Sequence, residues 1–323
     1  MRLLYVFNNL TKQCIEGTLP ATARAGEGYD ELICAQFLVP SDKDECAYYN
    51  EISALMRAFN RKKGIKSYTI LPTFRCNARC IYCYEEGVTQ TTMTPETVEQ
   101  VIRFIVSTHA GKKAKITWFG GEPLLGEGII DRICEGLREA GVEYKSTIIS
   151  NGSLISPEII SKMVREWKTY KIQITMDGAE EDYIPRKHYY VDRDYYHRVM
   201  ESVSQLSEAG ISVNIRCNVD EENWSRIPQF LNDLKAGVAH KENVNLYFAL
   251  LNASRMSEND VIMWRKIKDA RPLIEEAGFR SSSSKGGVRL KFRNNYCMAD
   301  GGAGMIRHAE PLCHKRKQVR INR

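Results

Sequence analysis

Three cysteines lie close together in the sequence. Cys76, Cys80 and Cys83 have the spacing Cys-x3-Cys-x2-Cys, so three thiols fall within eight residues. Thiolates are strong ligands for soft metals, and a group this compact can bind one face of a single metal centre. A structural zinc site normally takes four protein ligands, whereas three thiolates on a four-iron cluster leave one iron open. The spacing therefore favours an iron–sulfur cluster with room for a small chelating ligand, and a zinc-binding loop is the alternative.

A second candidate group follows a short apolar stretch at residues 114–119, which is typical of a buried strand. It consists of Gly120, Gly121, Glu122 and Pro123. Glycines after a strand let the backbone approach a ligand closely. A carboxylate at the same place can accept hydrogen bonds from an ammonium group. We therefore expect this strand end to contact a ligand that carries an amine, and a plain turn is the alternative.

The chain from residue 67 onward alternates between strand and helix patterns. The predicted strands are residues 67–73, 114–119, 144–150, 170–176, 211–219 and 243–251. The predicted helices are residues 94–110, 128–141, 156–167, 192–210, 223–237 and 257–278. Thr94 and Ser156 each precede a proline, as an N-cap residue often does. Alternation of this kind predicts a parallel sheet with right-handed crossovers, either doubly wound or curved into a barrel.

Polar residues lie at the ends of the later strands. Asn151 follows the third predicted strand, Asp177 follows the fourth, and Arg216 lies near the end of the fifth. A (β/α) barrel places the carboxyl ends of its strands around the active site, so this pattern favours the barrel. Asn-Gly and Asp-Gly are also turn formers in any fold, and a turn role is the alternative for Asn151 and Asp177.

Together, Cys-x3-Cys-x2-Cys-Tyr, Gly-Gly-Glu-Pro, Ser-Asn-Gly and Gln-x-x-Met-Asp-Gly resemble the motifs of radical S-adenosylmethionine (SAM) enzymes, in the branch that modifies peptides and proteins. The resemblance covers about residues 68–250. It implies an α/β fold, a partial (β/α)6 TIM-like barrel. It also implies a [4Fe–4S] cluster on Cys76, Cys80 and Cys83, whose open iron binds SAM. Reductive cleavage of SAM would then yield a 5′-deoxyadenosyl radical that abstracts hydrogen from a substrate.

The same resemblance implies roles for individual residues. Tyr82 matches an aromatic position near the adenine, and Gly120, Gly121 and Glu122 match the contact to the methionine amine of SAM. Asn151 and Arg216 would help to hold SAM. Gln173 and Asp177 would lie near the ribose or the substrate, with Asp177 as the candidate catalytic residue. Arg186 is the residue kept from a His-Asp-x-x-Arg segment that relatives often carry.

The two ends of the chain differ from the barrel. We expect an N-terminal α/β unit over residues 1–66, with a helix at 48–59, that captures a leader peptide or serves as a packing extension. The barrel is expected over residues 67–278 and a partial SPASM-type extension over 279–323. Cys297 and Cys313 resemble ligands of an auxiliary Fe–S cluster, but two cysteines cannot ligate two four-iron clusters. Cys134 and Cys217 stand apart from the other cysteines and are predicted to lie in the core.

Composition bounds the cellular setting. The hydrophobic fraction is 43% and the charged fraction 27%, which is ordinary for a globular protein, and no apolar run is long enough to span a membrane. No secretion signal is evident, so a cytoplasmic location is expected. The net charge of +6 suits an acidic peptide substrate, and the basic final residues read as a solvated end, so no nucleic-acid partner is expected.

The function expected from these features is maturation of a ribosomally made precursor peptide, by a thioether or another crosslink. The electron donor would be a flavodoxin or a ferredoxin. One alternative is a formylglycine-generating enzyme of the sulfatase-maturating type. The other is an inactive homologue that acts as a metal-cluster binding module.

Overall fold

The structure is a computed structural model that describes residues 4–7, 14–17, 47, 65–110, 113–191, 193–251 and 258–281. The chain divides into two units. Strands β1 (Leu4–Phe7) and β2 (Cys14–Gly17) pair antiparallel and belong to one unit, and residues 65–281 belong to the other. The predicted helix at 48–59 lies outside the described residues, as do Cys297 and Cys313. The predicted boundaries at residues 66 and 278 stay predictions.

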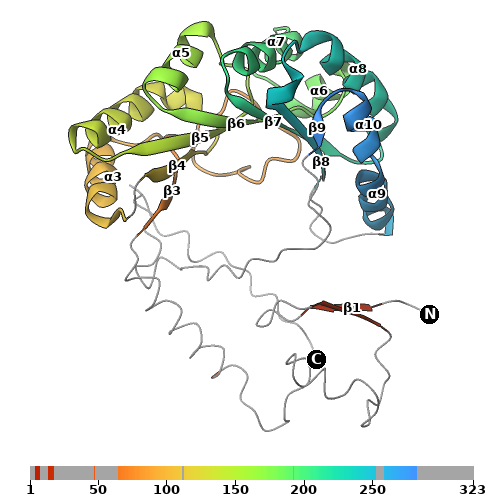
Figure 1. Cartoon of the computed structure of the whole chain (residues 1–323), viewed down its shortest axis with the longest axis horizontal. Coiled ribbons are helices and arrows are strands. Elements are labelled where there is room, and N and C mark those ends of the chain that lie inside the picture. The colour runs from red at the N-terminus through yellow and green to blue at the C-terminus, as the bar shows by residue number, and fades with distance from the viewer. Residues whose placement is uncertain are drawn as a thin grey trace. The chain divides into compact units, whose positions relative to one another are not determined.

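A parallel sheet of seven strands forms the centre of the larger unit, in the order β3-β4-β5-β6-β7-β8-β9 (Figure 1). The strands are β3 (Ser67–Ile70), β4 (Ala114–Trp118), β5 (Tyr144–Ser150), β6 (Thr169–Thr175), β7 (Ser212–Val219), β8 (Val244–Leu250) and β9 (Arg280–Ser281). Each strand pairs with the next one along the chain, and β3 does not pair with β9, so the sheet is open over the described residues. The predicted α/β partial barrel is confirmed.

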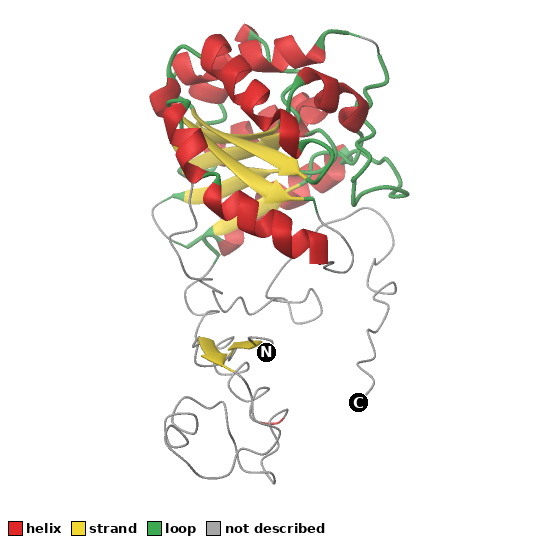
Figure 2. Cartoon of the chain, turned by 90° about the vertical axis from the view of Figure 1, so that its right-hand side faces the viewer, coloured by secondary structure: helices red, strands yellow, loops and turns green. Residues whose placement is uncertain are grey.

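Helices connect the strands and cover the outer, convex side of the curved sheet (Figures 1 and 2). They are α3 (Pro95–Thr108), α4 (Glu127–Glu139), α5 (Pro157–Arg165), α6 (Glu180–Lys187), α7 (Tyr195–Glu208), α8 (Ile227–Gly237), α9 (Glu258–Asp269) and α10 (Arg271–Glu276). Short 3-10 turns are η1 (Pro123–Gly126), η2 (Trp224–Arg226) and η3 (Lys241–Asn243). No described helix has both the length and the apolar character that a membrane crossing requires.

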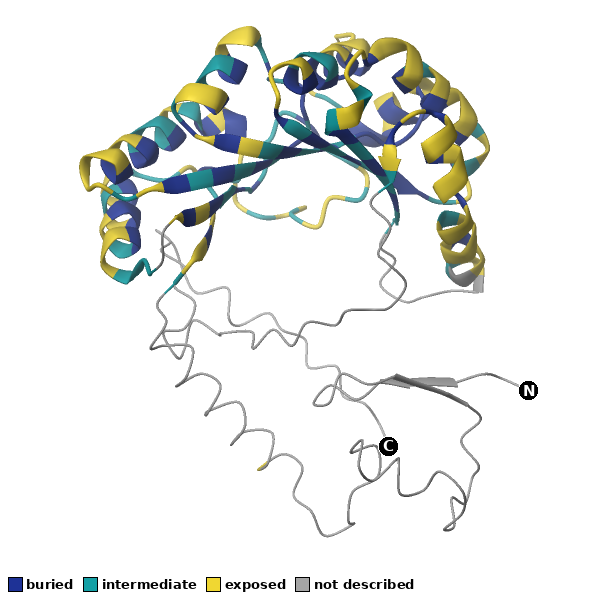
Figure 3. Ribbon diagram, viewed as in Figure 1, coloured by how far each residue is buried: buried dark blue, intermediate teal, exposed yellow. Residues whose placement is uncertain are grey.

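The sheet has one dry face and one polar face. In β5 every second residue from Tyr144 to Ser150 is buried against the helices, and the residues between them are half-buried (Figure 3). Thr117 on β4 and Thr147 on β5 belong to the half-buried set, and their hydroxyls hydrogen-bond at 3.0 Å. We call the side of the sheet that carries these residues the inner face. The core therefore lies between the sheet and the helices, as the alternation of strand residues requires.

Several local predictions are confirmed. Thr94 accepts a hydrogen bond from the backbone N–H of Thr97 at 3.3 Å, and Ser156 accepts one from Ile159 at 3.3 Å, so both are N-caps that precede a proline. Cys134 and Cys217 are fully buried in the core.

Two helix predictions were incomplete. The described part of the predicted helix at 257–278 forms two helices, α9 and α10, because Pro272 lacks an N–H and its ring conflicts with the preceding turn. Helix α6 was not predicted, since it is short and polar and contains Pro185. The two-residue strand β9 was also not predicted, because so short a segment has no measurable periodicity.

Candidate functional site

The cysteine loop, residues 71–94, connects β3 to α3 and carries the three clustered thiols. Cys76 and Cys80 are half-buried, Cys83 is exposed, and none of the three forms a disulfide. Two backbone hydrogen bonds of 2.8 and 3.0 Å close the base of the loop. The thiols therefore lie at the carboxyl ends of the parallel strands, which we call the carboxyl edge of the sheet. This is the edge where a (β/α) barrel has its active site.

The end of helix α6 holds the cysteine loop through the backbone. Arg79 N–H donates to the carbonyls of Lys187 at 3.1 Å and His188 at 2.9 Å, and Ile81 N–H donates to the carbonyl of Arg186 at 3.1 Å. The last carbonyls of a helix have no partner within it. The loop supplies these partners, so loop and helix fix each other's position.

The distances between the thiol sulfur atoms help to distinguish a site for a single ion from a site for a cluster. Zinc–sulfur bonds of about 2.3 Å place the sulfur atoms of a tetrahedral site about 3.8 Å apart. Among the described residues, the group of possible ligands whose donor atoms all lie within 4.8 Å of one another is Glu180, Asp194 and His197, on the surface. At least two of the three thiol sulfur atoms therefore lie more than 4.8 Å apart, which is wider than a single zinc ion requires. Burial raises the pKa of Cys76 to about 11, so ligation would release a proton there.

Gly120 and Gly121 let the cysteine loop run directly against the end of β4. A Cβ atom on Gly120 would lie 2.4 Å from the carbonyl oxygen of Thr73, and one on Gly121 would lie 2.4 Å from that of Arg75. Gly120 also has a φ of +117°, which other residues rarely adopt. Gly121 N–H donates to Thr73 at 3.2 Å, and Glu122 N–H donates to Arg75 at 2.8 Å. The pair of glycines thus joins the two motifs to each other.

Glu122 is fully buried and accepts three hydrogen bonds. Its Oε1 accepts from the Ser150 hydroxyl at 2.8 Å and from Leu124 N–H at 3.1 Å, and its Oε2 accepts from Asn151 N–H at 2.8 Å. Burial raises the pKa of this carboxyl from 4.5 to about 7, although these hydrogen bonds oppose the rise. A carboxylate has about four acceptor positions, so one remains for a further donor such as an ammonium group.

Asn151 connects Glu122 to the first cysteine. Its side-chain Nδ2 donates to Asn77 Oδ1 at 2.9 Å and lies 3.9 Å from Cys76 Sγ, as a weak hydrogen bond. Its Oδ1 accepts from the backbone N–H of Ser153 at 2.9 Å. These hydrogen bonds fix both ends of the side-chain amide. The residue is half-buried, so the amide still faces the loop.

A buried ion pair lies beneath the loop. Asp177 and Lys187 have side chains 0% and 2% exposed, and their charged atoms are 3.2 Å apart. Lys187 also donates to the Tyr82 hydroxyl at 2.9 Å, and that hydroxyl donates to Asp177 Oδ2. Asp177 Oδ1 accepts from Asn218 Nδ2 at 2.9 Å. Both oxygens of Asp177 are therefore occupied.

The charge of Lys187 is maintained by its neighbours. Burial lowers the pKa of Lys187, but the Asp177 carboxylate and the other acidic groups around it outweigh burial and hold the pKa above its ordinary value. Burial raises the pKa of Cys80, and the Lys187 ammonium opposes this rise. Lys187 therefore supplies a permanent positive charge close to the thiol group.

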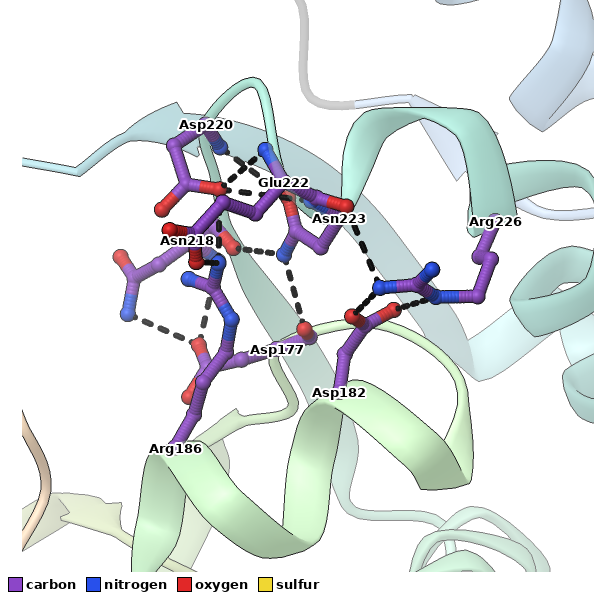
Figure 4. A network of polar contacts seen from close by, with 8 residues as sticks. All are labelled: Asp177, Asp182, Arg186, Asn218, Asp220, Glu222, Asn223 and Arg226. Atoms are coloured by element: carbon purple, nitrogen blue, oxygen red, sulfur yellow. Dashed lines mark hydrogen bonds and ion pairs between the residues drawn. The ribbon is translucent and has the colours of Figure 1, made fainter.

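A second set of polar contacts ties α6 to the end of β7 (Figure 4). Arg186 Nη2 donates to Asp220 at 2.6 Å and to Glu222 at 3.1 Å. Asn223 Nδ2 donates to the carbonyl oxygens of Asp177 and Asn218, each at 2.9 Å. These contacts surround the buried ion pair from the side opposite the cysteine loop. A pocket of about 290 Å³ lies beside them, lined mainly by carboxylates (Asp220, Glu221, Glu222 and Asp260).

Gln173 and Arg216 lie on the half-buried positions of β6 and β7. Gln173 Oε1 accepts from the Tyr247 hydroxyl on β8 at 2.9 Å, and Arg216 Nε donates to Asn218 Oδ1 at 2.9 Å. Burial raises the pKa of Tyr247, and the nearby Arg216 guanidinium opposes that rise. Arg216 therefore links the inner face to the buried ion pair through Asn218.

The structure brings the sequence-predicted residues together at the carboxyl edge. One run of contacts joins Cys76, Asn151 and Glu122, and another joins Tyr82, Asp177, Asn218 and Arg216. The individual roles predicted for these residues, including catalysis by Asp177, stay predictions.

Sequence reasoning missed Lys187, Asn77 and Tyr247. Lys187 belongs to the unpredicted helix α6, and a lysine in a polar segment gives no sign that it will be buried. Asn77 lies inside the cysteine motif at a position the motif leaves open. Tyr247 could have been found from strand alternation, because it shares a face with Asn245 on β8.

Comparison with known proteins identifies a family and several relatives with similar sequences. A family model described as Radical SAM superfamily matches residues 70–234. A probable GTP 3′,8-cyclase of Methanothermobacter marburgensis is 31% identical over 155 residues, which are 47% of this chain and 47% of that protein. The radical SAM cyclopropyl synthase TigE of Paramaledivibacter caminithermalis is 27% identical over 161 residues, 43% of this chain and 33% of that protein. This chain thus spans about half the length, or less, of these curated relatives.

Solved structures share the fold. The enzyme anSMEcpe, with bound AdoMet and the Cp18Cys peptide, aligns with a TM-score of 0.53 and 19% identity. The alignment covers 66% of this chain and 62% of that one.

Proposed function

This chain belongs to the radical SAM superfamily, and we propose that it uses radical chemistry to modify a peptide. The cofactors of the family are a [4Fe–4S] cluster and SAM. When bound, they supply one-electron cleavage of SAM to a 5′-deoxyadenosyl radical, which removes hydrogen from the substrate. A flavodoxin or a ferredoxin is proposed as the source of the electron.

The residues of the carboxyl edge suit the binding of these cofactors. Cys76, Cys80 and Cys83 are proposed as the cluster ligands, because three thiols leave one iron open. Glu122 is proposed to accept a hydrogen bond from the SAM ammonium at its remaining acceptor position. Asn151 would orient SAM beside Cys76, and the buried ion pair of Asp177 and Lys187 would hold Tyr82 in place. Gln173 and Arg216 are proposed to line the space for SAM or substrate.

The open sheet is the observation that carries the peptide assignment. Over the described residues, β3 and β9 are unpaired with each other, and most residues of the inner face are polar. A long, extended substrate can lie along such a face, whereas a small metabolite needs an enclosed cavity. The solved structure of anSMEcpe agrees with this proposal, since that structure contains a bound peptide. Which bond is formed, a thioether or another crosslink, belongs to the same proposal.

Two other substrates are candidates. A nucleotide is favoured by the 31% identity to a protein described as a probable GTP 3′,8-cyclase. A peptide cysteine oxidised to formylglycine is the second, and Cp18Cys is the peptide that accompanies anSMEcpe. Auxiliary clusters remain a prediction for the residues beyond 281.

The test is an anaerobic assay of the full chain after cluster reconstitution. SAM and dithionite are supplied with a pool of random peptides, with Cp18Cys or with GTP, and 5′-deoxyadenosine is quantified. We expect the peptide pool to raise 5′-deoxyadenosine release above the substrate-free rate and to yield peptides that have lost two hydrogens. Consumption of GTP with no effect of any peptide would replace this proposal with the nucleotide alternative. A formylglycine product from Cp18Cys alone would select the sulfatase-type alternative.

A further inference from the structure

The seven strands of the sheet have a one-sided charge composition. They contain no aspartate and no glutamate, and their charged residues are Lys115, Lys145, Lys171, Arg216 and Arg280. Strand residues alternate between the two faces, so a lysine on the face that packs against helices would have to be buried. The three strand lysines avoid this, because each belongs to the half-buried or exposed positions. We call Lys115, Lys145 and Lys171 the lysine row.

The lysine row lies on the inner face. Lys115 on β4 is the direct partner of Lys145 on β5. Each lies two residues before a threonine of the Thr117–Thr147 hydrogen bond, which fixes the face they share. Lys171 on β6 is the partner of Thr147 and is therefore diagonal to Lys145. Three ammonium groups thus project from three adjacent strands.

No described carboxylate lies within 4.0 Å of these three ammonium groups. The Lys145 ammonium lies 4.5 Å from the centre of the Tyr170 ring, which is a cation–π contact. On the same side, the exposed Glu143 pairs with Lys113 at 3.8 Å, outside the row. Like charges placed directly opposite each other on neighbouring strands are destabilising. The row therefore has an electrostatic cost that no described carboxylate offsets, which is typical of a binding surface.

We propose that the lysine row binds an acidic segment of the peptide substrate. This inference rests on the proposed function and names the class of peptide. A solvated lysine surface is the simpler reading, but the seven strands contain basic residues and no carboxylate, so the charge that they place on the inner face attracts anions. Arg216 continues the positive charge toward the carboxyl edge, because it lies four residues beyond Ser212, the partner of Lys171.

The strand register sets the distance between the acidic segment and the reacting residue. Each lysine lies six positions before a predicted site residue that follows the end of the same strand. Lys115 precedes Gly121, Lys145 precedes Asn151 and Lys171 precedes Asp177. At about 3.3 Å per residue, this separation is roughly 20 Å along the strand. An extended peptide covers the same distance in about six residues. The substrate is therefore expected to carry Asp or Glu about six positions from the residue that loses hydrogen.

Binding is measured by fluorescence anisotropy with the reconstituted full chain. The probes are a fluorescein-labelled twelve-residue peptide with a central run of glutamates and the same peptide with glutamines. We compare the natural chain with the triple variant Lys115→Gln, Lys145→Gln, Lys171→Gln. The control, Arg103→Gln, Lys235→Gln, Lys266→Gln, removes the same charge from exposed helix positions. We expect the triple variant to bind the glutamate peptide about tenfold more weakly or worse, and the control to change binding less than about twofold.

A charge-preserving variant separates binding from folding. Replacement of all three lysines by arginine should retain most of the affinity for the glutamate peptide. Equal affinity for the glutamate and glutamine peptides would overturn the proposal. So would a triple glutamine variant that unfolds at a much lower temperature, because the lysines would then stabilise the fold. Tighter, lysine-dependent binding of GTP than of the glutamate peptide would overturn it as well.

The readout also distinguishes this inference from the proposed function. The release of 5′-deoxyadenosine without peptide is measured in parallel and should be the same in the natural chain and the control variant, whose three positions are exposed on helices. If a peptide pool stimulates that release but acidic members have no advantage in KM, the proposed function holds and the lysine row is not its binding surface. If no peptide stimulates it, the proposed function fails by itself.

Discussion

The carboxyl edge and the lysine row place lysine side chains in opposite environments. Lys187 at the carboxyl edge is 2% exposed and lies 3.2 Å from a carboxylate that is also buried. Lys145 in the row is half-buried and has an aromatic ring, but no described carboxylate, as its neighbour. A buried charge must be compensated within the protein, whereas a charge that faces open space can be compensated by a ligand. The carboxyl edge therefore holds its side chains in fixed positions, whereas the lysine row is open to a ligand.

Loss of a cluster thiol should produce the largest effect, because it removes the group that the carboxyl edge positions. In Cys80→Ala we expect iron content to fall sharply and 5′-deoxyadenosine release to fall to background. Iron and acid-labile sulfide analysis of reconstituted protein provides the measurement. Cys134→Ala is the matched control, since Cys134 is fully buried away from the loop and should keep both cluster and activity. Full activity in Cys80→Ala would refute the assignment of the cluster ligands.

Breaking the buried ion pair should be the next largest effect. Lys187→Met leaves Asp177 charged and buried without its partner, and we expect the free energy of unfolding to fall by about 3–5 kcal/mol. The double variant Asp177→Asn, Lys187→Met should recover much of this loss, because it leaves no unpaired charge. Urea unfolding of the cluster-free protein measures both. A fall of less than about 1 kcal/mol for the single variant would show that the pair does not hold the site together.

The pH dependence of stability should reveal Glu122. Its pKa is 4.5 as a free group and about 7 in the folded protein, so the folded state binds a proton that the unfolded chain releases. Its contribution to stability is present at low pH and is lost as the pH rises from 4.5 to 7, by roughly 3 kcal/mol. Urea unfolding of SAM-free protein between pH 5 and 8 measures the slope. Glu122→Gln should remove that component, and parallel curves for the two proteins would contradict the assignment.

The lysine row should give the smallest effect, with the opposite sign. Lys115→Gln removes a repulsion from its direct partner Lys145 and keeps the Lys145–Tyr170 contact, so we expect stability to rise by about 0.2–0.5 kcal/mol. Thermal unfolding at low ionic strength measures this, and added salt should reduce the difference between the two proteins. A clear loss of stability would mean that Lys115 is compensated within the chain, and the contrast between the row and Lys187 would disappear.

The main elements of the fold could be predicted because each carries a local signal. The six long strands have apolar or alternating patterns, and Thr94 and Ser156 mark helix starts by hydrogen bonds made within one turn. The break at Pro272 and the helix α6 were harder. The break at Pro272 has a local cause that the predicted single helix overlooked. Helix α6 depends on tertiary packing that outweighs a weak local preference, because propensity summed over so few residues is small.

The candidate site could be predicted where residue type and spacing alone indicate the chemistry. The spacing of Cys76, Cys80 and Cys83 by itself predicts a metal centre. The order of the motifs along the chain indicates that they share one edge of a sheet. The reason for Gly120 and Gly121 was only partly predicted, because the group that approaches them closely is the cysteine loop. Contacts between segments far apart in sequence have no local pattern from which they can be read.

The sequence by itself determined the superfamily, the parallel sheet and the three thiols. The superfamily follows from the resemblance of the motifs, the sheet from periodicity, and the thiol group from ligand chemistry within one short segment. Only the tertiary structure decided that Lys187 lies buried against Asp177 and Tyr82. It alone also decided that three lysines from separate strands share one face without a carboxylate. Burial and strand register join residues more than 20 positions apart, and the free energy of a charge depends on those distant neighbours rather than on its own segment.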